Sequence, residues 1–390
     1  MKKQVVTIVG GGSSAHALIP FLTDINREIN ILTSRPKEWN SNIVLELRDS
    51  DNKIKKVFNG KLNIATDEAA KVIPNSDIII LCMPVHKYRE ALNKIAKYIS
   101  PNTIIGAIYG QGGFNFMVDE IKNKYNLSNI TTFAIGLIPW ICRTKEYGKV
   151  GITYGAKHLN IVAFDNKSKF MELRDFFNDM CFKWFKKGQF KLSENFISLT
   201  LSVDNQIIHP SRLYGLFKKY KGVWDNESDV PYFYRDYDEL SANLLRDLDN
   251  DYSLIRERIK KLYPFNNFEY MLDYLKLEQL TYGSSNKNIK ESFVKSETLA
   301  AIKTPVININ NKFVINKDHR FFYDDIYYGL CIAKWIAEKL QIEVKTIDEI
   351  LYWAQDILND KIINDGKLVK NNMSGSFDVY GCSTIDEIIK

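Results

Sequence analysis

The sequence predicts an α/β amino-terminal domain followed by a mainly α-helical carboxyl-terminal domain. In the first half, short runs rich in Val and Ile alternate with segments whose apolar residues recur at helical spacing. A glycine-rich turn joins the first apolar run, residues 4–10, to the first helical segment, residues 14–25. After Ser193 long amphipathic helices dominate. These observations favour a Rossmann-like domain over 1–192 and a helical domain over 193–390.

Composition narrows the class of protein. The chain has 390 residues, 45% of them hydrophobic, which suffices for two packed domains. The formal net charge is +6, but basic and acidic residues are interleaved, so nothing favours binding to nucleic acid. No apolar run reaches the roughly 18 residues of a membrane span, and the first run is too short for a signal peptide. The five cysteines lack CxxC and zinc spacing, so we expect reduced thiols, no metal site and a cytoplasmic protein.

The individual elements follow from the same patterns. Nearly continuous apolar strands separated by helices imply a parallel sheet that is covered on both faces. The predicted strands after the first are 28–34, 61–67, 76–84, 102–110, 129–136, 151–156 and 159–164, with helices at 85–99 and 114–125. The second half is predicted to contain helices at 194–208, 235–262, 324–340 and 346–358, with a hairpin at 304–315.

The glycine-rich turn predicts a dinucleotide site. Gly10, Gly12 and Ala15 form a GxGxxA pattern between a strand and a helix. The first glycine permits the tight turn, the second lets a pyrophosphate approach, and Ala15 allows close helix–strand packing. Ser13 and Ser14 open the helix, whose N–H groups favour a phosphate. The alternative is a glycine turn without a ligand.

The end of the second strand favours NADP(H) over NAD(H). An NAD site usually has an acidic residue there for the ribose hydroxyl. This chain instead has Ser34 and Arg35, which could bind a 2′-phosphate, followed by Lys37. Met83 and Pro84, at the end of the strand over 76–84, are expected to line the same site.

His209 is the most unusual of the five histidines. It directly precedes Pro210 in a region of helical pattern, and proline is costly inside a helix. A helix that ends at Pro210 could present the ring of His209 to a cleft, where it could exchange a proton, but the residues alone do not favour this role. The alternative is a histidine with satisfied hydrogen bonds at a capped helix end. His16, within the first helix, is expected to be a packing residue.

A second cluster contains Arg320, Asp324 and Asp325. One aspartate is expected to cap the helix that follows. The other could orient a histidine, and Arg320 could bind a substrate carboxylate through two hydrogen bonds.

Several motifs together resemble the octopine/nopaline (opine) dehydrogenase family, over nearly the whole chain. The most specific are "NQIIHPSRLYG" (205–215) and "RFFYDDIYYGL" (320–330), supported by "IYGQGGF" (108–114) and "IPWICRTKEYG" (138–148). Such enzymes condense the amino group of an amino acid with a 2-oxo acid, often pyruvate, and reduce the imine with NADH or NADPH. The resemblance therefore implies an NAD(P)-dependent oxidoreductase with small-molecule substrates.

The resemblance also implies roles for single residues. It places the catalytic histidine at His209, its partnering aspartate at Asp325, and the arginine for the oxo-acid carboxylate at Arg320. A glutamine that binds substrate falls on Gln111, and Asp324 becomes the helix cap. The chain departs from the family pattern at Tyr109 and Tyr327, where proline is common.

Alternatives remain at this stage. A 2-hydroxy-acid or sugar-phosphate dehydrogenase would share the two-domain plan but usually has a catalytic lysine, and a non-catalytic dinucleotide-binding protein would need none of these side chains. Four aromatic residues could line a substrate pocket or belong to the core: Tyr214, Trp224, Tyr232 and Tyr234. The sequence leaves open the identity of the amino acid and whether the protein is a homodimer.

Overall fold

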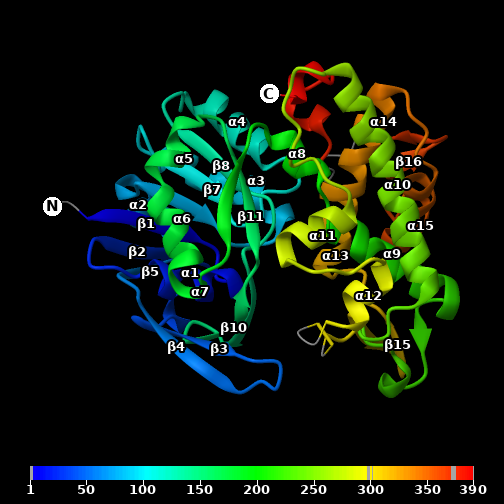
Figure 1. Cartoon of the computed structure of the whole chain (residues 1–390), viewed down its shortest axis with the longest axis horizontal. Helices are drawn as coiled ribbons and strands as arrows, with labels where there is room; N and C mark the ends of the chain where they lie inside the picture. Colours follow the sequence, from blue (N-terminus) through cyan, green and yellow to red (C-terminus); the bar gives the residue numbers. More distant parts are fainter. Residues whose placement is uncertain (1–2, 297–298, 301, 370–374, 390) are drawn as a thin grey trace. The chain divides into compact units, whose positions relative to one another are not determined.

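The computed structural model describes residues 3–296, 299–300, 302–369 and 375–389. The chain divides into two compact units (Figure 1). The amino-terminal unit comprises Met1–Leu199 with Thr281–Gly283, and the carboxyl-terminal unit comprises Thr200–Leu280 with Ser284–Lys390.

The main sheet of the amino-terminal unit has eight strands in the order β12-β11-β8-β7-β6-β1-β2-β5. From β5 to β8 all neighbours are parallel, and their order along the chain is 3-2-1-4-5-6, as in dinucleotide-binding folds. The predicted parallel sheet is thus confirmed for six strands, whereas β11 runs antiparallel to β8. The bounds are β1 Gln4–Val9, β2 Arg27–Leu32, β5 Ile64–Thr66, β6 Ile78–Leu81, β7 Ile104–Ala107, β8 Thr131–Ile135, β11 Leu159–Phe164 and β12 Gln189–Ser193.

A second sheet of four strands was only partly predicted. Its order is β4-β3-β10-β9, and the hairpin of β3 and β4 has no counterpart among the predicted strands. Most of β4 is exposed, and three of its eight residues are lysines, so it carries no clear apolar alternation. Helix α1 contacts strands of both sheets, and its apolar side chains form the core between them. The bounds are β3 Asn42–Arg48, β4 Ile54–Lys61, β9 Trp140–Glu146, β10 Val150–Ala156, α1 Ser13–Leu22, α3 Tyr88–Ile95 and α4 Phe114–Tyr125.

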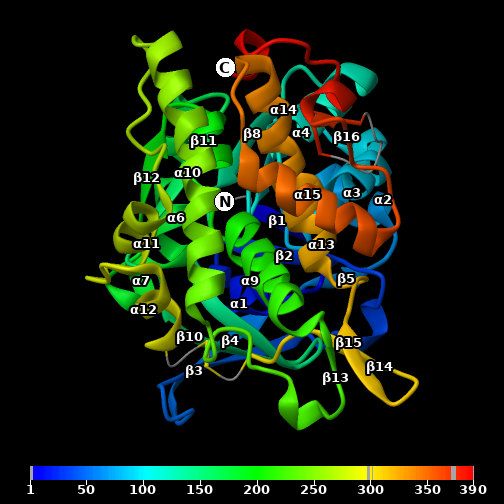
Figure 2. The same cartoon turned by 90° about the vertical axis from the view of Figure 1, so that its right-hand side faces the viewer.

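The carboxyl-terminal unit is mainly helical, as predicted, and Figure 2 shows its long helices α9, α10, α14 and α15. The predicted hairpin is also confirmed: β14 and β15 pair through a turn in which Asn310 and Asn311 have positive φ. The bounds are α8 Phe196–Leu201, α9 Asn205–Tyr220, α10 Glu239–Leu262, α11 Tyr274–Tyr282, α12 Ile289–Val294, α14 Cys331–Leu340, α15 Lys345–Leu358, β13 Val223–Trp224, β14 Val306–Ile309 and β15 Lys312–Ile315.

The expectation that Pro210 ends a helix is wrong. The break lies earlier, between α8 and α9, where the side chain of Asp204 accepts a hydrogen bond from the backbone N–H of Asn205. Pro210 lies inside α9, with buried residues from Gln206 to Leu216 on both sides. Burial of this helix outweighs the hydrogen bond that proline cannot donate.

The expectation that Asp324 caps a helix is also wrong. The cap is His319, whose ring accepts a hydrogen bond from the N–H of Phe321. From there a short helix, α13 (Arg320–Phe322), leads directly into the π-helix η6 (Tyr323–Leu330) and on to α14. Asp324 and Asp325 therefore lie within a helical run, and both are buried. π-Helical turns are rare and frequent at functional sites.

Three further features bear on the class of protein. No helix among the described residues is both long and apolar enough to cross a membrane. In the described ranges no cluster of three or more His, Cys, Asp or Glu side chains could hold a metal ion. All five cysteines are free thiols; four are buried and Cys382 is partly exposed.

Candidate active site

A cavity of about 600 Å³ lies at the carboxyl ends of the parallel strands in the amino-terminal unit. In open α/β sheets, ligands bind at this edge, where the strand order reverses. Most of the predicted cofactor residues line the cavity, namely Gly10, Gly12, Ser13, Ser34, Arg35, Met83 and Pro84. Ser14 and Ala15 are not among its lining residues; Ala15 is fully buried in the core.

The glycine-rich turn leaves room for a phosphate group. Gly10 has φ +104°, and a Cβ there would lie 2.6 Å from the carbonyl oxygen of Cys82. A Cβ on Gly11 would lie 2.3 Å from the hydroxyl of Tyr147. Gly12 is the N-cap of α1 and no side chain caps this helix. The N–H groups at the start of α1 therefore suit a pyrophosphate, and these residues fit a dinucleotide.

Arg35 follows the carboxyl end of β2 and lies beside an aromatic ring. Its guanidinium carbon is 3.6 Å from the ring centroid of Tyr147, and its Nη1 is 3.4 Å from Glu38. The hydroxyl of Tyr147 lies 3.2 Å from Thr33 Oγ1. The stacking holds Arg35 at the cavity wall with its charge half exposed.

Sequence reasoning missed several residues of this cavity. Lys87 and Lys94 are seven positions apart in the segment from η3 (Val85–Lys87) through α3, and both line it together with Glu90. Helical periodicity within the predicted helix 85–99 could have found this shared face. Tyr147 lies in the turn between β9 and β10 of the second sheet, and no local signal identifies it.

In the carboxyl-terminal unit, His209 and Asp325 form a buried pair. His209 Nδ1 lies 2.7 Å from Asp325 Oδ2, and each residue is 1% exposed. The ring of Phe321 stacks on the imidazole at 3.6 Å between centroids. The hydroxyl of Tyr234 lies 3.0 Å from Nε2. α9 provides the histidine and η6 the aspartate, 116 positions later in the chain.

Burial controls the protonation of this pair. It lowers the pKa of His209 well below its usual range, and Arg320 and His319 lower it further. It also raises the pKa of Asp325 well above its usual range, with the nearby charge of Asp324 adding to the rise. Both residues therefore disfavour an isolated charge, and the short Nδ1–Oδ2 contact lets them share one proton.

Arg320 lies about one helical turn before Asp325. Its Nη1 is 3.6 Å from Asp324 Oδ2, and its side chain is 47% exposed, whereas Asp324 is buried. The role of Asp324 is thus to pair with Arg320 within the helical run. The guanidinium remains accessible and could bind a carboxylate.

Gln111 lies in the amino-terminal unit, away from this pair in the sequence and in a different unit. It is 1% exposed, and its Nε2 donates a hydrogen bond to the carbonyl of Gly136 at 3.1 Å. Its predicted role in substrate binding stays a prediction.

Two family models match the chain. A family model described as the alpha-helical domain of NAD/NADP octopine/nopaline dehydrogenase matches residues 192–358. The chain belongs to the opine dehydrogenase family. A second model, described as NADP oxidoreductase coenzyme F420-dependent, matches residues 5–108 of the chain.

Several relatives match along nearly the whole length of the chain. Opine dehydrogenase of Haliotis discus hannai is 25% identical over 100% of this chain and 99% of its own. Octopine dehydrogenase of Pecten maximus is 21% identical over 98% of both chains.

Solved structures establish the same fold. Octopine dehydrogenase with NADH and L-arginine superimposes with a TM-score of 0.84 at 19% identity, covering 99% of this chain and 98% of the other. Yersinopine dehydrogenase with NADP+ bound superimposes with a TM-score of 0.66 at 13% identity, covering 92% and 91%.

The sequence did not indicate that two aromatic residues contact His209. Phe321 covers the imidazole, and Tyr234 contacts Nε2. Tyr234 was one of four aromatic residues considered for a pocket, and its separation of 25 positions from His209 left no local signal for the contact.

Proposed function

We propose that this protein joins the amino group of an amino acid to the keto carbon of a 2-oxo acid, with pyruvate favoured. The imine is then reduced to a secondary-amine dicarboxylate, which makes the protein an oxidoreductase of the CH–NH class. The observation that carries the proposal is the buried His209–Asp325 pair with the half-exposed Arg320 one turn away. The names of the relatives, and structures of octopine dehydrogenase with L-arginine and with pyruvate, support it.

Each residue has a distinct role in this proposal. His209 transfers a proton to the oxygen that leaves as water and takes one back from the reacting amine. Asp325 holds Nδ1, so that Nε2 is the nitrogen that exchanges the proton, and it stabilises the imidazolium. Arg320 binds the carboxylate of the 2-oxo acid. A reduced nicotinamide supplies the hydride when it is bound.

The cofactor is NADP(H) in preference to NAD(H) in our proposal. The support is Arg35, held at the cavity wall by Tyr147, together with Ser34 at the end of β2. A 2′-phosphate would find a half-exposed guanidinium there. Asp67, at the end of β5, also lines the cavity and is the residue that could instead accept a ribose hydroxyl.

Four further expectations join the proposal. The boundary of the cofactor domain lies at 192/193, and Gln111 contributes to substrate binding. The free, mostly buried thiols support a cytoplasmic location, where thiols stay reduced. A homodimer is the assembly that a sizing experiment would test first.

A substrate screen tests the function directly. Oxidation of NADPH and NADH is followed with pyruvate alone and with pyruvate plus each of the common amino acids and taurine. We expect turnover that depends on the amine and a product whose mass equals amine plus pyruvate minus one oxygen atom. Reduction of the oxo acid without an amine would instead indicate a 2-hydroxy-acid dehydrogenase, and cofactor binding with no turnover a non-catalytic protein.

A further inference from the structure

The imidazole of His209 is buried, and four side chains lie against it. Asp325 occupies Nδ1, Phe321 stacks on one face, and the ring of Phe233 lies edge-on at 5.6 Å. The hydroxyl of Tyr234 occupies Nε2. The residue as a whole is 1% exposed. A proton that leaves Nε2 therefore meets the oxygen of Tyr234 first.

The segment that carries this tyrosine, residues 231–238, is held by Arg212. The guanidinium donates hydrogen bonds to the backbone carbonyls of Tyr232 at 3.1 Å, Phe233 at 2.9 Å and Asp236 at 2.8 Å. These carbonyls lie on both sides of Tyr234 in the chain. Arg212 itself is fully buried, so this clamp is shielded from water.

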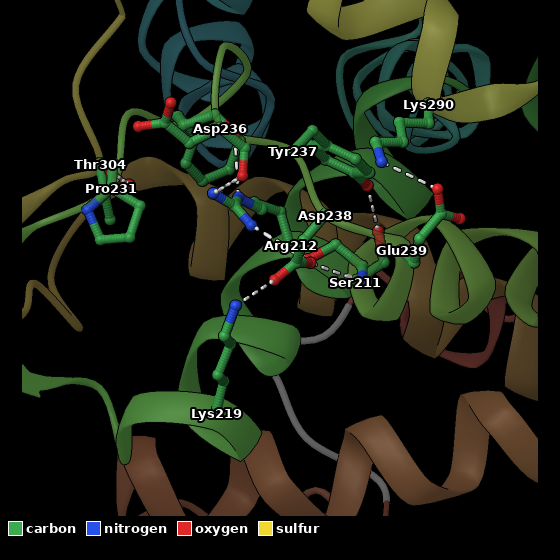
Figure 3. Close-up of polar contacts among 12 residues, drawn as sticks. Ser211, Arg212, Lys219, Pro231, Asp236, Tyr237, Asp238, Glu239, Lys290 and Thr304 are labelled. Atoms are coloured by element: carbon green, nitrogen blue, oxygen red, sulfur yellow. Dashed lines mark hydrogen bonds and ion pairs between the residues drawn. The ribbon is translucent and has the colours of Figure 1, made fainter.

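Figure 3 shows the surroundings of the clamp. Arg212 points toward Asp236, and its Nη1 also donates to Ser241 Oγ at 3.2 Å and lies 3.5 Å from Asp238 Oδ1. The hydroxyl of Thr304 donates to the carbonyl of Pro231. The segment is thus tied at both ends as well as in the middle, which argues against an easy displacement of Tyr234 from His209.

One helix holds both the histidine and the arginine. His209 and Arg212 are three positions apart on α9, so their side chains leave the same face. The same rigid element therefore fixes the ring and, through Arg212, the segment that brings Tyr234 onto it. The distance between His209 Nε2 and the hydroxyl of Tyr234 is therefore set by α9 and by the hydrogen bonds of Arg212.

We propose that Tyr234 is a catalytic residue that relays the proton of His209, and that Arg212 is the residue that positions it. The proposal rests on the proposed function, because that function requires His209 to exchange a proton. In the relay, Nε2–H of the imidazolium donates its proton to the oxygen of Tyr234. The tyrosine releases its own hydroxyl proton to the substrate oxygen or nitrogen in the same step.

The step balances without a charged tyrosine. One N–H bond of His209 and the O–H bond of Tyr234 break, while a new O–H bond forms on Tyr234 and one bond to hydrogen forms on the substrate. The tyrosine is unchanged at the end, and His209 is neutral. The substrate gains one proton, and the reverse sequence serves the oxidative direction.

Tyr234→Phe tests the relay, since it removes the hydroxyl and retains the ring. We expect kcat in the reductive direction to fall about 100-fold, the low end of the range for general acid–base groups, with the KM for NAD(P)H unchanged. The dependence of kcat on the deuterium fraction of the solvent should be curved in the wild type, where two protons move, and linear in the variant.

Tyr237→Phe is the matched control. This tyrosine lies in the same segment and is also buried, but its hydroxyl contacts Ser211 at 3.0 Å instead of His209 (Figure 3). Its kcat and solvent isotope behaviour should match the wild type. An equal loss in the two variants would show that the effect is structural and would overturn the relay, as would an unchanged or faster Tyr234→Phe enzyme.

Arg212→Lys tests the positioning role, because lysine cannot contact three carbonyls at once. We expect a smaller fall in kcat, and a double variant with Tyr234→Phe no slower than Tyr234→Phe alone. Additive losses would overturn the positioning role. If Arg212→Lys does not fold, as judged by thermal unfolding, Ser241→Ala removes one acceptor of the guanidinium and enters the same cycle.

A measurement without turnover separates this proposal from the proposed function. The nitrogen resonance of His209 Nε2 should shift in Tyr234→Phe and stay in place in Tyr237→Phe. A wild type that lacks amine-dependent turnover contradicts the proposed function. An Nε2 resonance that Tyr234→Phe leaves unmoved contradicts the relay, whatever reaction the wild type performs.

Discussion

The two units each bury one histidine, and the two imidazoles differ in the kind of hydrogen-bond partner that they have. His16 in α1 is fully buried; its Nδ1 lies 2.9 Å from the carbonyl of Gly12, and its Nε2 accepts a hydrogen bond from the N–H of Gly148 at 2.8 Å. His209 in α9 is buried to the same degree, but its partners are the side chains of Asp325 and Tyr234.

The difference lies in what the partners can do with a proton. A carbonyl and an amide N–H fix the His16 ring in one neutral tautomer, with Nδ1 protonated, and neither can take up or pass on its proton. A carboxylate and a phenol can. Burial lowers the pKa of both histidines, so burial alone does not distinguish them. The chemistry of the partners does.

The largest expected effect is the loss of turnover when His209 is replaced. His209→Ala should lower kcat about 1,000-fold, because the proton carrier is lost, while the Kd for NAD(P)H stays within error. Steady-state kinetics and a cofactor fluorescence titration measure the two quantities. His158→Ala, at an exposed histidine, is the control and should keep full activity. An active His209→Ala enzyme would assign the proton transfer to another residue.

Asp325→Asn should have the next largest effect, because it gives His209 a neutral partner like those of His16. The amide fits the same space but no longer stabilises the imidazolium, so we expect kcat to fall about 100-fold with folding retained. Circular dichroism and thermal unfolding check the fold. A variant that keeps more than half of the wild-type kcat would contradict the role of the carboxylate.

His16→Gln should change stability instead of chemistry. One backbone group at Gly12 or Gly148 loses its partner, which costs about 1–3 kcal/mol in the free energy of unfolding. Its kcat at saturating cofactor should equal that of the wild type. A fall in kcat with unchanged stability would reverse the assignment of the two histidines.

The free energy of unfolding should depend on pH through His16. Burial lowers the pKa of His16 below its unfolded value of 6.5, so the unfolded chain binds more protons as pH falls. The contribution of a neutral His16 is therefore complete above pH 6.5 and is progressively lost below it. Denaturant unfolding from pH 8 to pH 5 should show a steeper loss for the wild type than for His16→Gln; parallel curves would contradict this.

The smallest expected effect concerns the cofactor cavity. Arg35→Ala should lower the ratio of kcat/KM for NADPH to that for NADH about tenfold, or about 1.4 kcal/mol, through loss of a partly exposed charged contact. Lys37→Ala is the control, because Lys37 lies two positions later in the chain and does not line the cavity. A ratio that Arg35→Ala leaves unchanged would remove the support for NADP(H).

Patterns within short stretches predicted much of the fold. The first strand and the glycine turn, the helix 346–358 and the hairpin 304–315 all depend on neighbours in the chain, and the structure contains each of them. The hairpin of β3 and β4 was not predicted, because its second strand is largely exposed and lacks an apolar pattern. The predicted end of the helix at Pro210 was wrong because the burial of α9 offsets the hydrogen bond that proline cannot donate, and this burial cannot be seen in the local sequence.

The glycine turn and the two kinds of domain could be predicted from the residues alone, and the resemblance of the motifs implied the pairing of His209 with Asp325. These follow from backbone sterics, from periodicity and from residues that recur together. Three contacts became visible only in the folded chain. Tyr234 contacts Nε2 of His209, Arg212 binds the segment around Tyr234, and Tyr147 stacks on Arg35. The physical reason is distance along the chain: contacts between elements far apart depend on how whole faces pack, which no local pattern encodes.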